Sequence, residues 1–119
     1  MAKHNELGKV GEQIAVNFLL KKGYKILERN YYFKKIEVDI IAQKNNTLAV
    51  IEVKTRSTAY YGNPQDFVKP AQIKRIVTAI DYYTQENNID LEIQFDIIAI
   101  LKTKNNHVIK HLENAFYHF

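Results

Sequence analysis

Two neighbouring segments of this chain combine β-branched residues with regularly spaced charges, and this pattern most constrains the fold. Residues 36–42 read Ile-Glu-Val-Asp-Ile-Ile-Ala, and residues 49–54 read Ala-Val-Ile-Glu-Val-Lys. Neither segment contains glycine or proline, and this composition is typical of β-strands. Asn45-Asn46 lies between them, and asparagine tolerates the left-handed backbone of a tight turn. The pattern therefore predicts an antiparallel hairpin with charges inside apolar strands.

The position of the turn predicts the register of this hairpin. Asp39 should face Glu52, and Glu37 should face Lys54. Strand alternation then places these charges on one face and an apolar set on the other: Ile36, Val38, Ile40, Ala49, Ile51 and Val53. Directly opposed side chains have Cβ atoms roughly 4.5–5.5 Å apart, so like charges there repel each other. A divalent cation between Asp39 and Glu52 would turn this repulsion into coordination.

The rest of the chain predicts regular elements on both sides of the hairpin. Helical periodicity runs over residues 7–22, and Gly8 and Gly11 within it suggest a close contact with a neighbour. A second helix should begin at Pro70 and bury one stripe: Ile73, Ile76, Val77, Ile80 and Tyr83. Further strands are expected at 24–29, 91–101 and 108–112, with a connection at 30–35 and a loop at 57–69. The order αβββαββ indicates an α/β layer domain with a mixed sheet.

Size and composition predict a single domain over residues 1–119. The chain is 46% hydrophobic and 25% charged, which is typical of a soluble globular protein with one core. It contains no cysteine, which excludes disulfides and thiolate ligands and favours a reducing, cytoplasmic setting. The absence of a long apolar run or a signal-peptide core predicts no membrane association. A net charge of +4 favours a polyanionic partner such as nucleic acid, although ordinary surface charge explains it too.

A third carboxylate is expected near the hairpin. Glu12 falls within the apolar arc of the first helix, where an unpaired charge costs several kcal/mol. Together with Asp39, Glu52 and the Val53 carbonyl, it would form a hard-oxygen site suited to Mg²⁺ or Mn²⁺. Such a site would polarise a phosphodiester and lower the pKa of a bound water, with Lys54 orienting the nucleophile or neutralising developing charge. This is the chemistry of nucleic-acid hydrolysis.

Spacing alone leaves a simpler interpretation open. Asp39 or Glu37 would pair with Lys54 as cross-strand ions on a solvated face, which stabilises a sheet by at most about 1 kcal/mol. Glu12 would then be a partly exposed helix carboxylate. The histidines at positions 4, 107, 111 and 118 lack zinc-ligand spacing and are interpreted as surface or strand-end residues. Asp96 is expected to make a structural hydrogen bond.

A set of short motifs is spread along nearly the whole chain: Gly8-x-x-Gly11-Glu12-x-x-Ala15, Gly23-Tyr24, Asn30, Glu37-x-Asp39-x-Ile41-Ala42, Glu52-Val53-Lys54-x-Arg56, Gly62-x-Pro64, Phe95-Asp96 and Asn114-Ala115-Phe116. Together these motifs resemble the YraN-type family of uncharacterised proteins. That family is similar to the restriction-endonuclease-like superfamily with its PD-(D/E)xK site, near the archaeal Holliday-junction resolvases. Val38 stands where the nominal motif has proline, which leaves the carboxylate of Asp39 in place.

The resemblance implies a restriction-endonuclease-like three-layer core, with a mixed sheet flanked by helices. It places Glu12, Asp39, Glu52 and Lys54 at the acidic, metal-binding and lysine positions. It also implies Mg²⁺-dependent cleavage of DNA, with branched or repair intermediates as substrates. Related resolvases work as dimers, so the resemblance leaves open whether this chain is a monomer or a homodimer.

Several basic and aromatic residues are candidates for contact with the nucleic acid. Arg56 is the first choice, because it follows Lys54 by two and should project from the same face. Other candidates for contact with phosphates are Lys69, Arg29, Lys34, Lys35, Lys74 and Arg75, and Tyr31, Tyr32, Tyr60 and Tyr61 are candidates for stacking. The resemblance also implies that Gln72 lies near the metal and the nucleic acid. The alternatives to a nuclease are a non-catalytic nucleic-acid-binding module of the same fold and an interaction domain with no polyanionic partner.

Overall fold

The computed structural model describes residues 2–57 and 68–116 of the chain. Within these residues, two helices and five strands follow one another in the predicted order αβββαββ. Their bounds are α1 Ala2–Lys21, β1 Lys25–Phe33, β2 Ile36–Lys44, β3 Thr47–Arg56, α2 Pro70–Glu86, β4 Glu92–Lys102 and β5 His107–Leu112. Most of the loop predicted at 57–69 lies outside the described residues.

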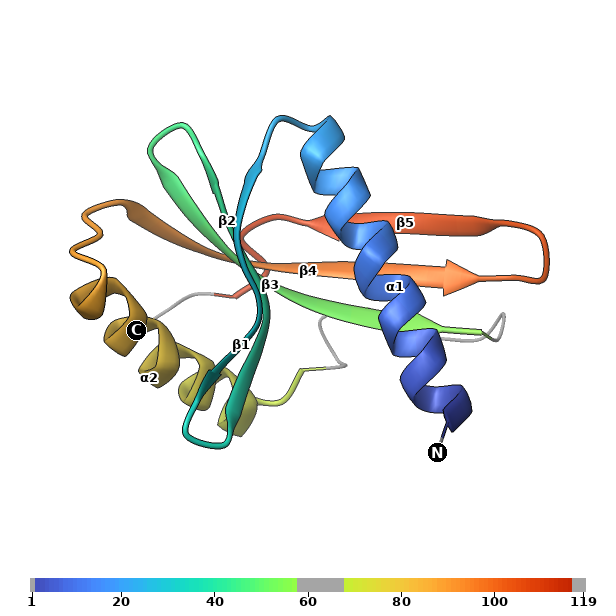
Figure 1. Cartoon of the computed structure of the whole chain (residues 1–119), viewed down its shortest axis with the longest axis horizontal. Coiled ribbons are helices and arrows are strands. Elements are labelled where there is room, and N and C mark those ends of the chain that lie inside the picture. Colours follow the sequence, from blue (N-terminus) through green and yellow to red (C-terminus); the bar gives the residue numbers. More distant parts are fainter. Residues whose placement is uncertain (1, 58–67, 117–119) are drawn as a thin grey trace.

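The five strands form one mixed sheet in the order β1-β2-β3-β4-β5. β3 and β4 are parallel, whereas the other neighbouring pairs are antiparallel. Parallel neighbours need a crossover connection, and the chain between β3 and β4 contains α2. Figure 1 shows α1 lying across the sheet and α2 beside β1 and β2.

Each helix covers a different face of the sheet and has its own apolar core. The α1-side core contains Ala15, Val16 and Leu19 of α1 with Ile40, Ala42, Ala49, Ile51, Ile98 and Ile100. The α2-side core contains Ile76, Ala79, Ile80 and Tyr83 of α2 with Val38, Ile41, Leu48, Val50 and Phe95. Alternation along β3 supplies both cores, because successive side chains point to opposite faces. The predicted three-layer mixed α/β core is therefore confirmed.

Both helices are close to the positions predicted from periodicity. α2 begins at Pro70, where the missing N–H of proline costs no hydrogen bond. Its buried stripe matches the prediction except that Ala79 is buried and Val77 only partly so. α1 begins at Ala2 rather than at residue 7. Within the described residues, neither helix offers the length of apolar surface that crossing a membrane requires.

The alternation of β2 changes at Asp39, which corrects the predicted distribution of faces. Val38 packs in the α2-side core, whereas Ile40 packs in the α1-side core. The prediction that Ile36 and Val38 share a face with Ile40 is therefore wrong. Asn30 lies at the same level of β1, between the residues paired with Ile40 and Val38, and its φ of 52° interrupts that strand too. The two strands change face together at this level.

β1 continues beyond the predicted strand end. It runs to Phe33, so the connection predicted at 30–35 is wrong for residues 30–33. Tyr31 and Phe33 pack against the α2-side core, and this burial keeps the segment in the sheet. The chain turns only at Lys34, which adopts a φ of 56°.

Candidate functional site

Asp39 lies where the backbone pairing of β2 with β3 ends. The paired residues stop at Ile40 and Ile51, in the predicted register that would bring Asp39 opposite Glu52. Beyond that point, Asp39 Oδ2 accepts a hydrogen bond from the backbone N–H of Val53 at 2.8 Å. A side chain thus replaces the missing main-chain acceptor, and the Asp39 carboxyl is held against β3.

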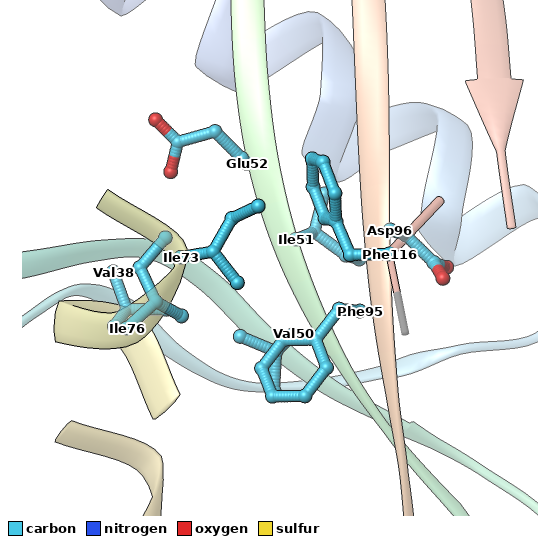
Figure 2. Close-up of a pocket in the computed structure, with 9 residues that line it drawn as sticks. All are labelled: Val38, Val50, Ile51, Glu52, Ile73, Ile76, Phe95, Asp96 and Phe116. Carbon is cyan, nitrogen blue, oxygen red and sulfur yellow. The ribbon is translucent and has the colours of Figure 1, made fainter. Parts of the chain in front are cut away.

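Glu52 projects from β3 toward α2 and is only 9% exposed. Its Oε2 accepts a hydrogen bond from Gln72 Nε2 at 2.9 Å and lies 3.4 Å from Lys54 Nζ. Figure 2 shows the Glu52 carboxyl pointing away from the apolar side chains around Ile73 and Ile76. The carboxylate therefore sits at the border of the α2-side core, where an ammonium and an amide offset its burial.

Burial and neighbouring charge raise the pKa of both carboxyl groups. For Asp39, loss of solvent has the largest effect and the Glu52 charge the next, and the pKa reaches about 8 although the Val53 hydrogen bond opposes the rise. Burial also raises the pKa of Glu52, against the lowering effects of Lys54 and Gln72. Two neighbouring acids that resist ionisation mark a place where a cation would be favourable.

A second acidic pair lies on the α1 side of Asp39. Asn30 Nδ2 donates to Glu12 Oε2 at 3.0 Å and to Glu37 Oε2 at 2.8 Å. Arg29 Nη2 lies 4.0 Å from Glu12 Oε1. Asn30 of β1 therefore links a carboxylate of α1 to one of β2, and its left-handed φ of 52° is a conformation that asparagine tolerates.

Two clefts meet at Asp39 and Glu37, which line both of them. The larger cleft, of about 700 Å³, opens on the α1 side, and its lining includes Lys9, Glu12, Asn30, Tyr32, Val53, Lys54 and Arg56. The smaller cleft, of about 230 Å³, opens toward α2, and its lining includes Lys35, Glu52, Gln72 and Arg75. We call them the α1-side cleft and the α2-side cleft.

The predicted metal ligands are divided between these clefts. Asp39 shares the α1-side cleft with Glu12 and Val53, and it shares the α2-side cleft with Glu52. Glu12 and Glu52 do not line the same cleft, and no three acidic or histidine side chains of the described residues already form a cation site. The donors are nevertheless carboxylate and carbonyl oxygens, which Mg²⁺ and Mn²⁺ prefer. Asp39 lines both clefts, and by donor chemistry it would suit such an ion together with Glu52 from one cleft and Val53 from the other.

Of the residues predicted to contact nucleic acid, five line a cleft: Arg56, Gln72, Lys35, Arg75 and Tyr32. Tyr60 and Tyr61 lie outside the described residues. Arg56 is exposed in the α1-side cleft, and its Nη1 donates to the Thr55 carbonyl at 3.0 Å. Gln72 lines the α2-side cleft and holds Glu52. Lys69 is the exposed N-cap residue of α2 and lines neither cleft.

His111 lies one residue before the end of β5, as predicted for a strand-end histidine, but it is not a surface residue. Its side chain is 4% exposed, and its Nε2 lies 2.8 Å from Asp96 Oδ2. Lys22 Nζ lies 2.8 Å from Nδ1, and because lysine can only donate, Nε2 carries the proton given to Asp96. Asp96 Oδ1 also accepts the Asn114 N–H at 3.0 Å, so its predicted structural role is confirmed.

Asn30 and Glu37 were not among the predicted site residues, although both line the α1-side cleft. Glu37 stands two residues before Asp39, and that spacing was a usable signal. Asn30 was marked only by the family motif. Its link to Glu12 depends on where α1 crosses β1, which local spacing does not encode.

The fold and the clefts define the class: a three-layer α/β protein with a carboxylate and lysine cluster where two central strands separate. The model of the "Uncharacterised protein family UPF0102" matches residues 11–100, which contain Glu12, Asp39, Glu52 and Lys54. A UPF0102 protein of Flavobacterium psychrophilum is 58% identical over 119 residues and one of Christiangramia forsetii 56%, each covering 100% of both chains. One of Phocaeicola vulgatus is 46% identical over 98% of this chain and 97% of its own. The chain belongs to the UPF0102 family, and the YraN-type resemblance is confirmed.

Proposed function

We propose that the protein is a divalent-cation-dependent endonuclease that hydrolyses phosphodiester bonds in DNA. The observation that carries this proposal is the placement of Asp39 and Glu52, two largely buried carboxyls with raised pKa values, beside Lys54. Keeping two acids together away from water is unfavourable unless a positive group compensates them. A bound cation would compensate the two carboxyls, and an anionic substrate would pair with Lys54.

The cation would be Mg²⁺ or Mn²⁺, held by Asp39, Glu52 and the Val53 carbonyl. When bound there, it would supply Lewis-acid polarisation of the phosphodiester and lower the pKa of a water molecule. Lys54, with Nζ 3.4 Å from Glu52, would orient that water or neutralise charge at phosphorus. Gln72 holds the Glu52 carboxylate in position through its 2.9 Å hydrogen bond.

Hydrolysis joins the water oxygen to phosphorus and breaks one phosphorus–oxygen ester bond. The water gives up a proton to solvent, and the departing oxygen takes one up. Glu12 adds negative charge to the α1-side cleft, where its charge is among the causes that raise the pKa of Asp39. The resemblance of the sequence motifs to PD-(D/E)xK nucleases and archaeal resolvases supports the reaction and favours branched or repair intermediates as substrates.

Nicking of a supercoiled plasmid in Mg²⁺ or Mn²⁺ tests the proposal. We expect Asp39→Ala and Lys54→Ala to lower the rate by about 100-fold or more, because each removes charge or coordination at the reacting phosphate. Lys104→Ala is the control, since it changes net charge as Lys54→Ala does but lies outside both clefts. Nicking by both site variants at the rate of the unchanged protein refutes the site assignment.

A non-catalytic nucleic-acid-binding module of the same fold is the second candidate. It is favoured by the present pairing of the acids, since Glu12 is bound to Asn30 and Glu52 to Lys54 and Gln72. Titration with Mn²⁺ separates the two functions, because an ion that binds only the folded chain raises its thermal stability. Unchanged melting in Mn²⁺, together with salt-dependent DNA binding and no cleavage, would make the binding module the better account.

A further inference from the structure

The two clefts share two acidic residues, and basic side chains line each cleft. Asp39 and Glu37 belong to both clefts. Lys54 and Arg56 line the α1-side cleft, and Lys35 and Arg75 line the α2-side cleft. Positive side chains therefore stand on either side of the residue that carries the proposed reaction.

Lys35 and Arg75 come from separate elements that the fold brings together. Lys35 lies in the turn between β1 and β2, and Arg75 lies on the exposed side of α2. With the residues that the structure describes, neither forms an ion pair or a side-chain hydrogen bond. Lys35 and Arg75 are exposed and line the same cleft as Glu52 and Asp39. Exposed basic side chains at the border of an acidic cleft favour the approach of an anion.

We propose that a DNA strand crosses the molecule through both clefts, with the reacting phosphate over Asp39 and the flanking phosphates on opposite sides of it. This inference rests on the proposed function and adds the path of its substrate. Lys35 and Arg75 bind phosphates on one side of the reacting bond, and Arg56 binds those on the other, while Lys54 stays at the reacting phosphate. Asp39 and Glu37 repel the phosphates of the strand except where the cation is bound. The flanking basic residues therefore supply the affinity for DNA.

The proposed path has a consequence for the kind of bond that is cleaved. A site that holds phosphates on both sides of the reacting bond does not require a strand end. Here the strand has basic contacts before and after Asp39, so the bond cleaved lies inside the strand. The substrate class is therefore an uninterrupted strand, including one with no ends at all.

Binding of a covalently closed DNA circle of about 40 unpaired nucleotides tests the path without turnover. Asp39→Asn serves as the background, so that binding is measured without cleavage. We expect Lys35→Ala with Arg75→Ala to weaken binding about tenfold and to make the salt dependence shallower by about 1.4, which is roughly 0.7 for each lost phosphate contact. Lys104→Ala with Lys110→Ala removes the same charge outside both clefts and should change affinity less than about twofold. Equal weakening by the two pairs overturns the path.

Cleavage of the same circle by the chain with Asp39 intact separates failure of the path from failure of the function. The path predicts that Mg²⁺ lets the protein open the circle about as fast as it cuts a linear strand of the same sequence. Stepwise removal of nucleotides from linear strands with no opening of circles keeps the hydrolase but overturns the path. If neither substrate is cut while the Lys35 and Arg75 binding defect persists, the hydrolase fails and the path stands.

Discussion

At the scale of single residues, Asp39 joins the local fold to the proposed chemistry. It occupies the level where β2 and β3 stop pairing, and its side chain accepts the Val53 N–H that a neighbouring strand would otherwise bond. This position brings the carboxyl next to Glu52 and raises its pKa to about 8. Val53 lines the α1-side cleft at the same level. One interruption of the sheet therefore accounts for both the proposed ligand set and the space around it.

The raised pKa of Asp39 predicts that the metal-free protein loses stability as the pH rises. Between the unfolded value near 3.8 and the folded value of about 8, the folded chain keeps a proton that the unfolded chain has released. The folded state then binds more protons, so the free energy of unfolding falls across this window. Asp39→Asn removes the effect and should stabilise the metal-free protein by on the order of 2 kcal/mol at about pH 8, and by little near pH 4.

Urea denaturation in the presence of a chelator, at about pH 4 and about pH 8, measures this difference. The pH dependence of the two proteins should diverge toward alkaline pH, with the Asp39→Asn variant becoming the more stable. Parallel profiles for the unchanged protein and the variant would mean that the Asp39 carboxyl ionises normally in the folded chain.

Spacing predicted the residues of the hairpin well and the residues beyond it poorly. The register from Asn45-Asn46 brings Asp39 near Glu52 because a short turn leaves few alternatives. The Asn30 link to Glu12 and the burial of His111 depend on contacts between distant elements. A single sequence carries no local signal for such contacts.

At the scale of elements, the position of α1 is set by one close contact. Gly11 lies against Thr55 of β3 so tightly that a methyl group on Gly11 would overlap the Thr55 side chain. Glu12 follows Gly11 directly, so this contact also determines where the Glu12 carboxylate meets Asn30. The close packing predicted from the glycines is thus confirmed for Gly11, whereas a methyl group on Gly8 would meet no atom within 4 Å.

Gly11→Ala and Gly8→Ala therefore form a matched pair with opposite expected results. We expect Gly11→Ala to destabilise the protein by about 1–3 kcal/mol, because α1 must move away from Thr55. Gly8→Ala should be neutral or stabilise by up to about 1 kcal/mol, because alanine favours helix and the site is open. Thermal denaturation of both variants checks this, and equal effects would show that α1 does not pack closely at Gly11.

Element types were predictable, but their limits and faces were less so. β-branched runs and helical periodicity identified every strand and helix, since each pattern matches one repeat of the backbone. The predicted end of β1 was wrong because Asn30 read as a break, whereas burial of Tyr31 and Phe33 keeps the chain in the sheet. The change of face at Asp39 violates strict alternation, and it occurs where the site lies.

At the scale of the whole molecule, a buried network joins α1, β4 and β5. Asp96 is 1% exposed and binds His111 of β5, the backbone of Asn114, and Gln94. His111 in turn contacts Lys22 at the end of α1. The Ala115 N–H donates to the Phe95 carbonyl at 2.8 Å, which holds the segment after β5 against β4. This network holds together the β4 and β5 strands and the end of α1, whereas the clefts lie at β1, β2 and β3.

Loss of Asp96 should cost far more stability than loss of the outer member of the network. Asp96→Ala leaves His111 and the Asn114 N–H without an acceptor in a dry site, and we expect about 3 kcal/mol of destabilisation. Lys22→Met removes the ammonium that lies 5.1 Å from the centre of the Phe18 ring but keeps an apolar side chain of similar length, and it should cost less than about 1 kcal/mol. Chemical denaturation ranks the two, and a larger loss for Lys22→Met would contradict the central place of Asp96.

The three-layer core was predictable at this scale because the element order leaves few ways to cover both faces of one sheet. The clefts were not predictable, because they form only where β1, β2, β3 and both helices come together.

The central claim is that the shared border of the two clefts binds a divalent cation. Diffraction at the manganese absorption edge from crystals soaked in Mn²⁺ tests it most directly. The account predicts one anomalous peak in contact with the carboxyls of Asp39 and Glu52 and the Val53 carbonyl. No peak there, with Asp39 still bound to the Val53 N–H and Glu52 to Lys54 and Gln72, would contradict it.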